Sequence, residues 1–161
     1  MKSILDNAYE LFLDTISYNE KLVINVIEGI KAEEAEDLEF GENIIEGTYR
    51  VEPNENSRKF QIVFESPITW QVTDESYTSW DDYEIRDDKN SIQILEKSKF
   101  FDYIMKNHGW FEDVVGPGKH YRILTLDQII DVISCDVPII DKYTTPNKSI
   151  KKRDRASRTA P

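Results

Sequence analysis

Alternating apolar and polar positions give the clearest pattern in the chain. Residues 58–65 place every second side chain on an apolar face, which predicts a half-buried strand. Pro67 interrupts the alternation because proline cannot donate to a sheet ladder. The pattern resumes over residues 68–73 and predicts a second strand. The side chains that we expect in the core of these strands are Phe60, Ile62, Phe64 and Trp70.

Helical spacing of apolar residues predicts three helices. Residues 3–16 carry an amphipathic pattern that begins with a serine cap and an acidic first turn. Ser98 is expected to cap a helix that ends near Gly109. Residues 125–133 begin with a T-x-x-Q capping box, which predicts a third helix.

Residues 20–30 fit two patterns. Their apolar positions follow helical spacing, whereas the β-branched run VINVI favours a strand, and we favour the helix. The acidic run at 33–39 is expected to be solvated, and 41–47 is expected to be a connection.

Turn signals predict two antiparallel hairpins. A strand at 48–52 is followed by a Pro-Asn-rich turn, which would pair it with the strand at 58–65. Residues 83–86 and 91–95 flank a polar turn and form the second predicted hairpin, and 120–124 predicts a further strand. The sequence therefore predicts an α+β fold, an antiparallel sheet built of hairpins with helices on one face or end.

Charge divides the chain of 161 residues into two parts. Residues 147–161 hold six basic residues and one acid, a net charge of +5, whereas residues 1–146 have a net charge of −16. We expect 1–146 to be a single α+β domain and 147–161 to be a basic, disordered tail. The one cysteine, Cys135, excludes an intramolecular disulfide and a four-cysteine zinc site, and we expect it to be a small buried hydrophobe.

The strong acidity favours a basic protein partner over nucleic acid or an anionic membrane, since both of these repel negative charge. The longest apolar runs are only a few residues long, so no segment is expected to span a membrane. The first residues carry acids where a signal peptide has an apolar stretch. We therefore expect a cytoplasmic protein.

No stretch of the chain matches a catalytic motif. The residues at 116–118 lack the lysine of a phosphate-binding loop, and there is no G-x-S-x-G nucleophile elbow. His108 and His120 have no spacing typical of metal ligands. We expect no catalytic residues, no bound metal and no cofactor, with a small hydrolase that uses His120 and nearby carboxylates as an alternative.

Aromatic residues are interspersed among acidic ones between residues 74 and 89, a stretch with seven acids and two bases. Trp and Tyr are common anchors of protein interfaces, and acids around them attract a basic partner. The opposite interpretation places the aromatic side chains in the core and the acids on a solvated face. The predicted partner-binding residues are Asp74, Glu75, Tyr77, Trp80, Asp81, Asp82, Tyr83 and Glu84.

Three segments resemble a family of small acidic proteins of Gram-positive bacteria. They are ITWQVTDESY (68–77), SKFFDYI (98–104) and HYRILTLDQIIDVIS (120–134), and the resemblance spans about residues 40–140. Some members of that family are thought to be immunity proteins encoded beside polymorphic toxins. The resemblance implies a protein that binds and occludes a basic toxin domain, such as a secreted nuclease. A housekeeping protein-interaction module remains an alternative, and the basic tail is not a feature that we associate with the family.

Overall fold

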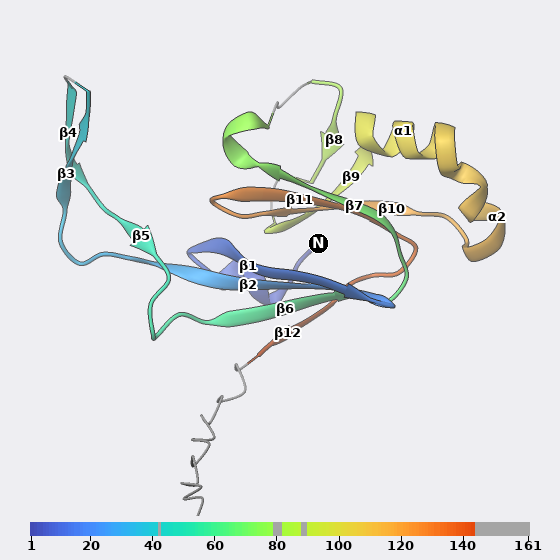
Figure 1. The fold of residues 1–161 in the computed structure, drawn as a ribbon, viewed down its shortest axis with the longest axis horizontal. Helices are drawn as coiled ribbons and strands as arrows, with labels where there is room; N and C mark the ends of the chain where they lie inside the picture. The colour runs from blue at the N-terminus through green and yellow to red at the C-terminus, as the bar shows by residue number, and fades with distance from the viewer. Residues whose placement is uncertain (42, 79–81, 88–89, 144–161) are drawn as a thin grey trace, which may run out of the picture.

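Two antiparallel sheets, packed face to face, make up the body of the protein (Figure 1). The computed structural model describes residues 1–41, 43–78, 82–87 and 90–143. The first sheet has the strand order β1-β2-β6-β12, and β5 pairs with the end of β2. These strands are β1 (Glu10–Asn19), β2 (Lys21–Lys31), β5 (Val51–Glu52), β6 (Lys59–Phe64) and β12 (Ile139–Lys142).

The second sheet has the strand order β7-β11-β10-β9-β8. Its strands are β7 (Pro67–Asp74), β8 (Ile85–Arg86), β9 (Ile92–Lys97), β10 (Lys119–Leu124) and β11 (Gln128–Ser134). The predicted strands at 68–73 and 120–124 and the hairpin of 83–86 with 91–95 are confirmed. The two predicted strands around Pro67 belong to different sheets, because the chain crosses from the first layer to the second at this proline.

The main core fills the space between the two sheets. Phe60, Ile62 and Phe64 on β6 have no exposed surface, which confirms the predicted apolar face. The ring of Phe64 lies 5.4 Å from the ring of Tyr121 on β10, so the two layers meet through these aromatic side chains. Trp70 differs from the prediction, since it is only half-buried and its ring lies 5.0 Å from that of Tyr18.

One helical segment joins β9 to β10, on the side of the second sheet that faces away from the first (Figure 1). Ser98 caps α1 (Lys99–His108) as predicted, and Gly109 follows its last residue. The chain continues through the short turns η3 (Gly109–Phe111) and α2 (Glu112–Val115). A small second core forms beneath them from Ile104, Phe111 and Ile133, with the half-buried Cys135 at its border. The fold is therefore a β-dominated α+β arrangement.

Two predicted helices are wrong. In residues 3–16 only η1 (Ile4–Asn7) is helical, and residues 10–16 belong to β1. The capping box of Ser3 is present, yet it caps this single turn. Residues 128–134 form β11, and the Thr125 hydroxyl accepts from the Gln128 amide (3.0 Å) to close the hairpin between β10 and β11.

The ambiguous stretch at 20–30 is strand β2, so the helix that we favoured is also wrong. The predicted hairpin of 48–52 with 58–65 is wrong as well, because both β5 and β6 pair with β2. β2 lies at the centre of the first sheet, and its β-branched residues satisfy the strand preference that the VINVI run indicated.

The acidic run and the predicted connection after it form a separate two-stranded hairpin, β3 (Glu36–Phe40) and β4 (Asn43–Thr48). This hairpin, called the arm below, projects away from the sandwich at the end of β2 (Figure 1). No helix in the described part of the chain is long and apolar enough to cross a membrane. The predicted tail at 147–161 lies outside the described residues.

Candidate functional site

The predicted partner-binding residues lie in the segment that connects β7 to β8. The segment begins with Asp74 and the short turn η2 (Glu75–Tyr77). Trp80 and Asp81 lie outside the described residues. The other predicted residues fall into two groups, because β7 and β8 are the opposite edge strands of the second sheet. Asp74, Glu75 and Tyr77 lie at the end of β7 and just after it, and 82–84 precede β8. The two groups also differ in how far they face solvent.

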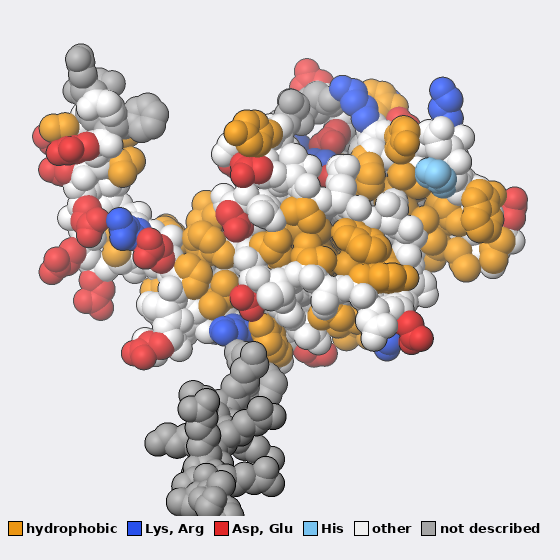
Figure 2. All heavy atoms as spheres, in the orientation of Figure 1, with side chains coloured by type: hydrophobic (Ala, Val, Ile, Leu, Met, Phe, Trp, Pro, Cys, Tyr) orange, Lys and Arg blue, Asp and Glu red, His pale blue; other side chains and the backbone are white. Residues whose placement is uncertain are grey.

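Asp74, Glu75 and Tyr77 form the exposed part of the segment. The Asp74 carboxylate accepts from the Ser76 amide (3.0 Å), as an N-cap residue does. The Glu75 amide donates to the carbonyl of Asp127 (3.2 Å), which ties η2 to the turn between β10 and β11. The Tyr77 side chain is 82% exposed. Figure 2 shows hydrophobic atoms with acidic atoms beside them at the place that η2 has in Figure 1.

A hollow of about 290 Å³ lies beside Glu75. It forms where β1, η2 and the turn between β10 and β11 meet, and backbone bonds hold these parts together, such as that from the Leu126 amide to the Leu11 carbonyl (2.7 Å). Its lining combines two exposed carboxylates with three aliphatic side chains and a threonine. The lining residues are Glu10, Glu75, Leu124, Thr125, Leu126 and Ile129. This arrangement suits a side chain with an apolar stem and a positively charged end.

Tyr83 connects the segment to α1. Its hydroxyl hydrogen-bonds the carboxylate of Asp102, and the Lys97 ammonium lies 4.0 Å from the centre of its ring. Only 37% of the Tyr83 surface is exposed, so most of the ring is used within the protein. Asp82, next to it, is exposed.

Glu84 faces inward and is bound by Arg122. The Arg122 guanidinium donates to both Glu84 oxygens, at 2.6 and 3.0 Å, and the Glu84 side chain is almost fully covered. A two-pronged bond of this kind fixes the orientation of both groups. We therefore leave Glu84 out of the binding surface, because its charge is already balanced inside the molecule.

Arg122 belongs to a buried polar cluster on the outer face of the second sheet. Strand alternation points Tyr121 into the main core and its neighbours His120 and Arg122 to the opposite side. Asp131 is paired with Arg122 across β10 and β11 and accepts from its Nε (2.7 Å). Asp131 also accepts from Gln71 Nε2 on β7 (3.0 Å). The cluster joins three strands to the segment that carries Glu84.

The carboxylate of Asp131 stays ionised far into the acid range. Burial alone would raise the pKa of Asp131, but the hydrogen bonds from His120 and Arg122 and the charge of Arg122 outweigh burial and lower this pKa to about 2. The charged form is therefore part of the folded state, and it anchors the cluster at neutral pH.

Ser98, His120 and Asp131 follow one another at hydrogen-bond distance. Ser98 Oγ lies 2.7 Å from Nδ1 of His120, and Nε2 lies 2.9 Å from Asp131 Oδ1. The residue types are those of a hydrolytic triad, but Ser98 and His120 have no exposed surface. The Ser98 hydroxyl also accepts from the Phe101 amide (3.0 Å) as the cap of α1. In this arrangement the hydroxyl is enclosed within the protein and has no surface open to solvent.

Sequence reasoning missed Asp131 and the link between Ser98 and His120. The sequence pattern places Asp131 in a helix, so its position opposite Arg122 could not be foreseen. One signal was available, since single charged or polar residues stand inside the apolar runs of both strands. The described residues contain no group of three or more His, Cys, Asp or Glu side chains placed to hold a metal ion.

Comparison with known proteins adds no relative to these observations. Family models, curated proteins and solved structures were all compared with the chain, and none of them matches it. The resemblance to immunity proteins therefore stays a prediction, and the site must be interpreted from its own geometry.

Proposed function

We propose that this chain is an immunity-type protein that binds and occludes a basic toxin domain and performs no chemistry itself. The observation that carries the proposal is the hollow lined by Glu10 and Glu75, with the exposed Tyr77 two residues further along the chain. A lysine or arginine of the partner would lay its stem on Leu126 and place its charged end between the two carboxylates. Tyr77 would add an aromatic contact next to this ion pair.

The charge of the whole chain supports the same partner. Residues 1–146 have a net charge of −16, which attracts a basic protein over a distance and raises the rate of association. The segment is also held in place before binding, because Glu84 is fixed by Arg122 and η2 is tied to Asp127. A surface that is already ordered loses less conformational entropy when the partner binds.

The hydrolase alternative has one observation in its favour, the series Ser98, His120 and Asp131. Its weakness is burial, since a nucleophile must reach the substrate. The first step is to assay the protein for turnover of a small ester or amide. If turnover is found, the same assay on His120→Ala decides between the two functions. Loss of that turnover in the variant would favour the enzyme.

The proposed function is tested by capture and protection. The full chain is used to isolate its partner from the organism that encodes it, and the partner is then produced in a test bacterium with and without the chain. We expect a basic protein that stops growth alone and is harmless when the chain is present. A partner that is acidic, or one that remains toxic in the presence of the chain, contradicts the proposal.

Binding kinetics on that partner locate the surface. Glu10→Gln with Glu75→Gln should slow association and weaken its salt dependence, while Glu55→Gln, an exposed acid in the loop before β6, serves as the matched control. Tyr77→Ala should instead speed dissociation and cost about 2 kcal/mol of binding free energy. Equal kinetics in all three variants would remove this surface from the function.

A further inference from the structure

The arm formed by β3 and β4 has no core beneath it. Among the described residues the two strands pair only with each other, and they stand clear of the sandwich (Figure 1). An isolated two-stranded hairpin is only marginally stable in water, and its open edges invite contacts with other chains. The projecting hairpin is therefore a candidate for contact with another protein.

Aliphatic side chains are exposed on both faces of the arm. Leu38 and Ile45 lie directly opposite each other across the two strands and are 53% and 51% exposed. Ile44, paired with Glu39, lies on the other face and is 63% exposed. Single exposed apolar residues are common, but three of them on one small hairpin form a surface that is suited to a partner.

The charge of the arm selects the kind of partner. Between Ala32 and Tyr49 the sequence has seven acids and no lysine or arginine. Figure 2 shows acidic side chains along the arm with hydrophobic ones between them. Two such arms would repel each other, so the charge opposes association with a second copy and favours a basic surface.

The arm has a defined shape rather than an open loop. Gly47 adopts a positive φ of 69°, and its amide donates to the Asp37 carboxylate (3.1 Å) where the register between the strands shifts. The Thr48 hydroxyl donates to the Glu36 carbonyl (2.6 Å) at the same place. These bonds fix a bulge that twists the hairpin and sets the directions of its apolar side chains.

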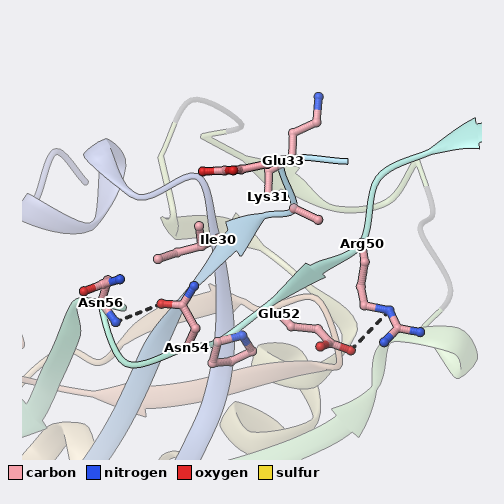
Figure 3. A pocket seen from close by; sticks show the side chains of 9 residues that line it. Ile30, Lys31, Glu33, Arg50, Glu52, Asn54 and Asn56 are labelled. Carbon is pink, nitrogen blue, oxygen red and sulfur yellow. Dashed lines mark hydrogen bonds and ion pairs between the residues drawn. The ribbon is translucent and has the colours of Figure 1, made fainter. Parts of the chain in front are cut away.

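The foot of the arm is also fastened to the sandwich. The Ala32 amide donates to the Arg50 carbonyl (2.8 Å), next to the pairing of β2 with β5. A hollow of about 530 Å³ lies at this foot, and its lining mixes both signs of charge, as in the ion pair of Arg50 with Glu52 (3.5 Å; Figure 3). A lining with both signs of charge does not favour a ligand of either charge. We therefore interpret the foot as the attachment of the arm to the sandwich.

We propose that the arm is a second docking element, which enters a basic groove with an apolar floor on the partner protein. Leu38 and Ile45 would contact the floor on one side of the hairpin and Ile44 on the other, while the acids pair with basic residues at the rim. The inference deepens the proposed function and rests on it for the occluding role. The basic character of the groove follows from the arm's own charge.

A photo-crosslinking amino acid tests this proposal while the partner is still unidentified. A benzophenone side chain is placed at Ile44 of the full chain, which is expressed in the organism that encodes it, and the adducts are identified by mass spectrometry. The control carries the same group at Ile139 on β12, which is 50% exposed. We expect a basic protein to be crosslinked at Ile44 and not at Ile139. Adducts with a second copy, with residues 147–161 or with an acidic protein, or no specific adduct, would overturn the proposal.

Affinity for the crosslinked protein gives the second measurement. Leu38→Ser with Ile45→Ser should raise Kd by about 10-fold or more, and Ile139→Ser should change it by less than about 2-fold. Unchanged affinity in the arm variant would also overturn the proposal. A basic partner that is harmless to cells but needs the arm for binding would support the docking role of the arm and contradict the toxin-immunity function. A toxin whose affinity is unchanged by the arm substitutions would support the proposed function and contradict the docking role of the arm.

Discussion

The arm and the segment after β7 are both acidic and both expose apolar side chains, yet they are held by opposite means. The segment is fastened from below, where Arg122 binds Glu84 and where Asp131 in turn binds Arg122. Within the described residues, the arm is fastened along its own ladder and at its foot. Similar runs of acids in the sequence thus become one surface built on the sandwich and one element that stands apart from it.

The difference shows where acidic residues are used. Glu84 neutralises a buried arginine and contributes to the fold, whereas the described acids of the arm remain in solvent and are available to a partner. Local charge density alone could not separate these two uses. The separation depends on Arg122, which lies 38 residues from Glu84 in the sequence.

The core between the two sheets should dominate stability. Phe64→Ala removes a buried ring that contacts Tyr121, and we expect a loss of about 4 kcal/mol in the free energy of unfolding. Chemical denaturation measures this loss. A change below about 1 kcal/mol would show that the two sheets do not meet at Phe64.

Breaking the anchor should affect the segment and leave the arm unchanged. Arg122→Leu leaves Asp131 and Glu84 without their shared cation, and we expect a loss of about 3 kcal/mol in stability. Amide hydrogen exchange should also become faster in β8, next to Glu84, while the rates in residues 36–48 stay the same. Equal acceleration in both regions would contradict the proposed difference between them.

Acid should release the same anchor without any mutation. The pKa of Asp131 is about 2 in the folded protein and near 4 when unfolded, so the ionised carboxylate stabilises the fold above pH 4. This contribution, about 2 kcal/mol, is lost as the pH falls from 4 to 2. Urea titrations of the protein and of Asp131→Asn should therefore converge over that range. A constant difference in stability would show that Asp131 is not the titrating group.

Substitutions on the arm should have the smallest effect on folding. Leu38→Ser with Ile45→Ser changes exposed residues, and we expect the free energy of unfolding to shift by less than about 0.5 kcal/mol. Thermal unfolding of this variant beside Ile62→Ser, a buried position, makes the contrast direct. A large loss in the arm variant would mean that the arm packs on the body in solution.

The depth of burial alone did not decide which strands could be predicted from the sequence. β6 and the deeply buried β10 were predicted as strands, whereas β2 and β11 were predicted as helices. β6 alternates between fully buried and half-buried positions, so its pattern is informative. β11 is buried along nearly its whole length, and its continuous apolar run resembles a helix face. The capping signals at Ser3 and Thr125 are correct as hydrogen bonds, but the first closes a single turn and the second a hairpin.

Pairing and site geometry depend on contacts that no local pattern contains. β6 pairs with β2 and β12, which are distant in the sequence, instead of with its neighbour β5. The same limit hid the cluster around Asp131, because it requires the register between β10 and β11. The exposure of Asp74 and Glu75 could be predicted, because the solvent exposure of an acidic residue can be inferred without knowledge of the strand pairing.

The central claim is that two separate acidic surfaces bind one basic partner. Hydrogen–deuterium exchange of the full chain, measured alone and in complex with the captured partner, tests it most directly. We predict slower exchange in residues 36–48 and 74–78, with unchanged rates in β6 at the centre of the core. Protection confined to other parts of the sandwich, such as β12, or no protection in either region would contradict the account.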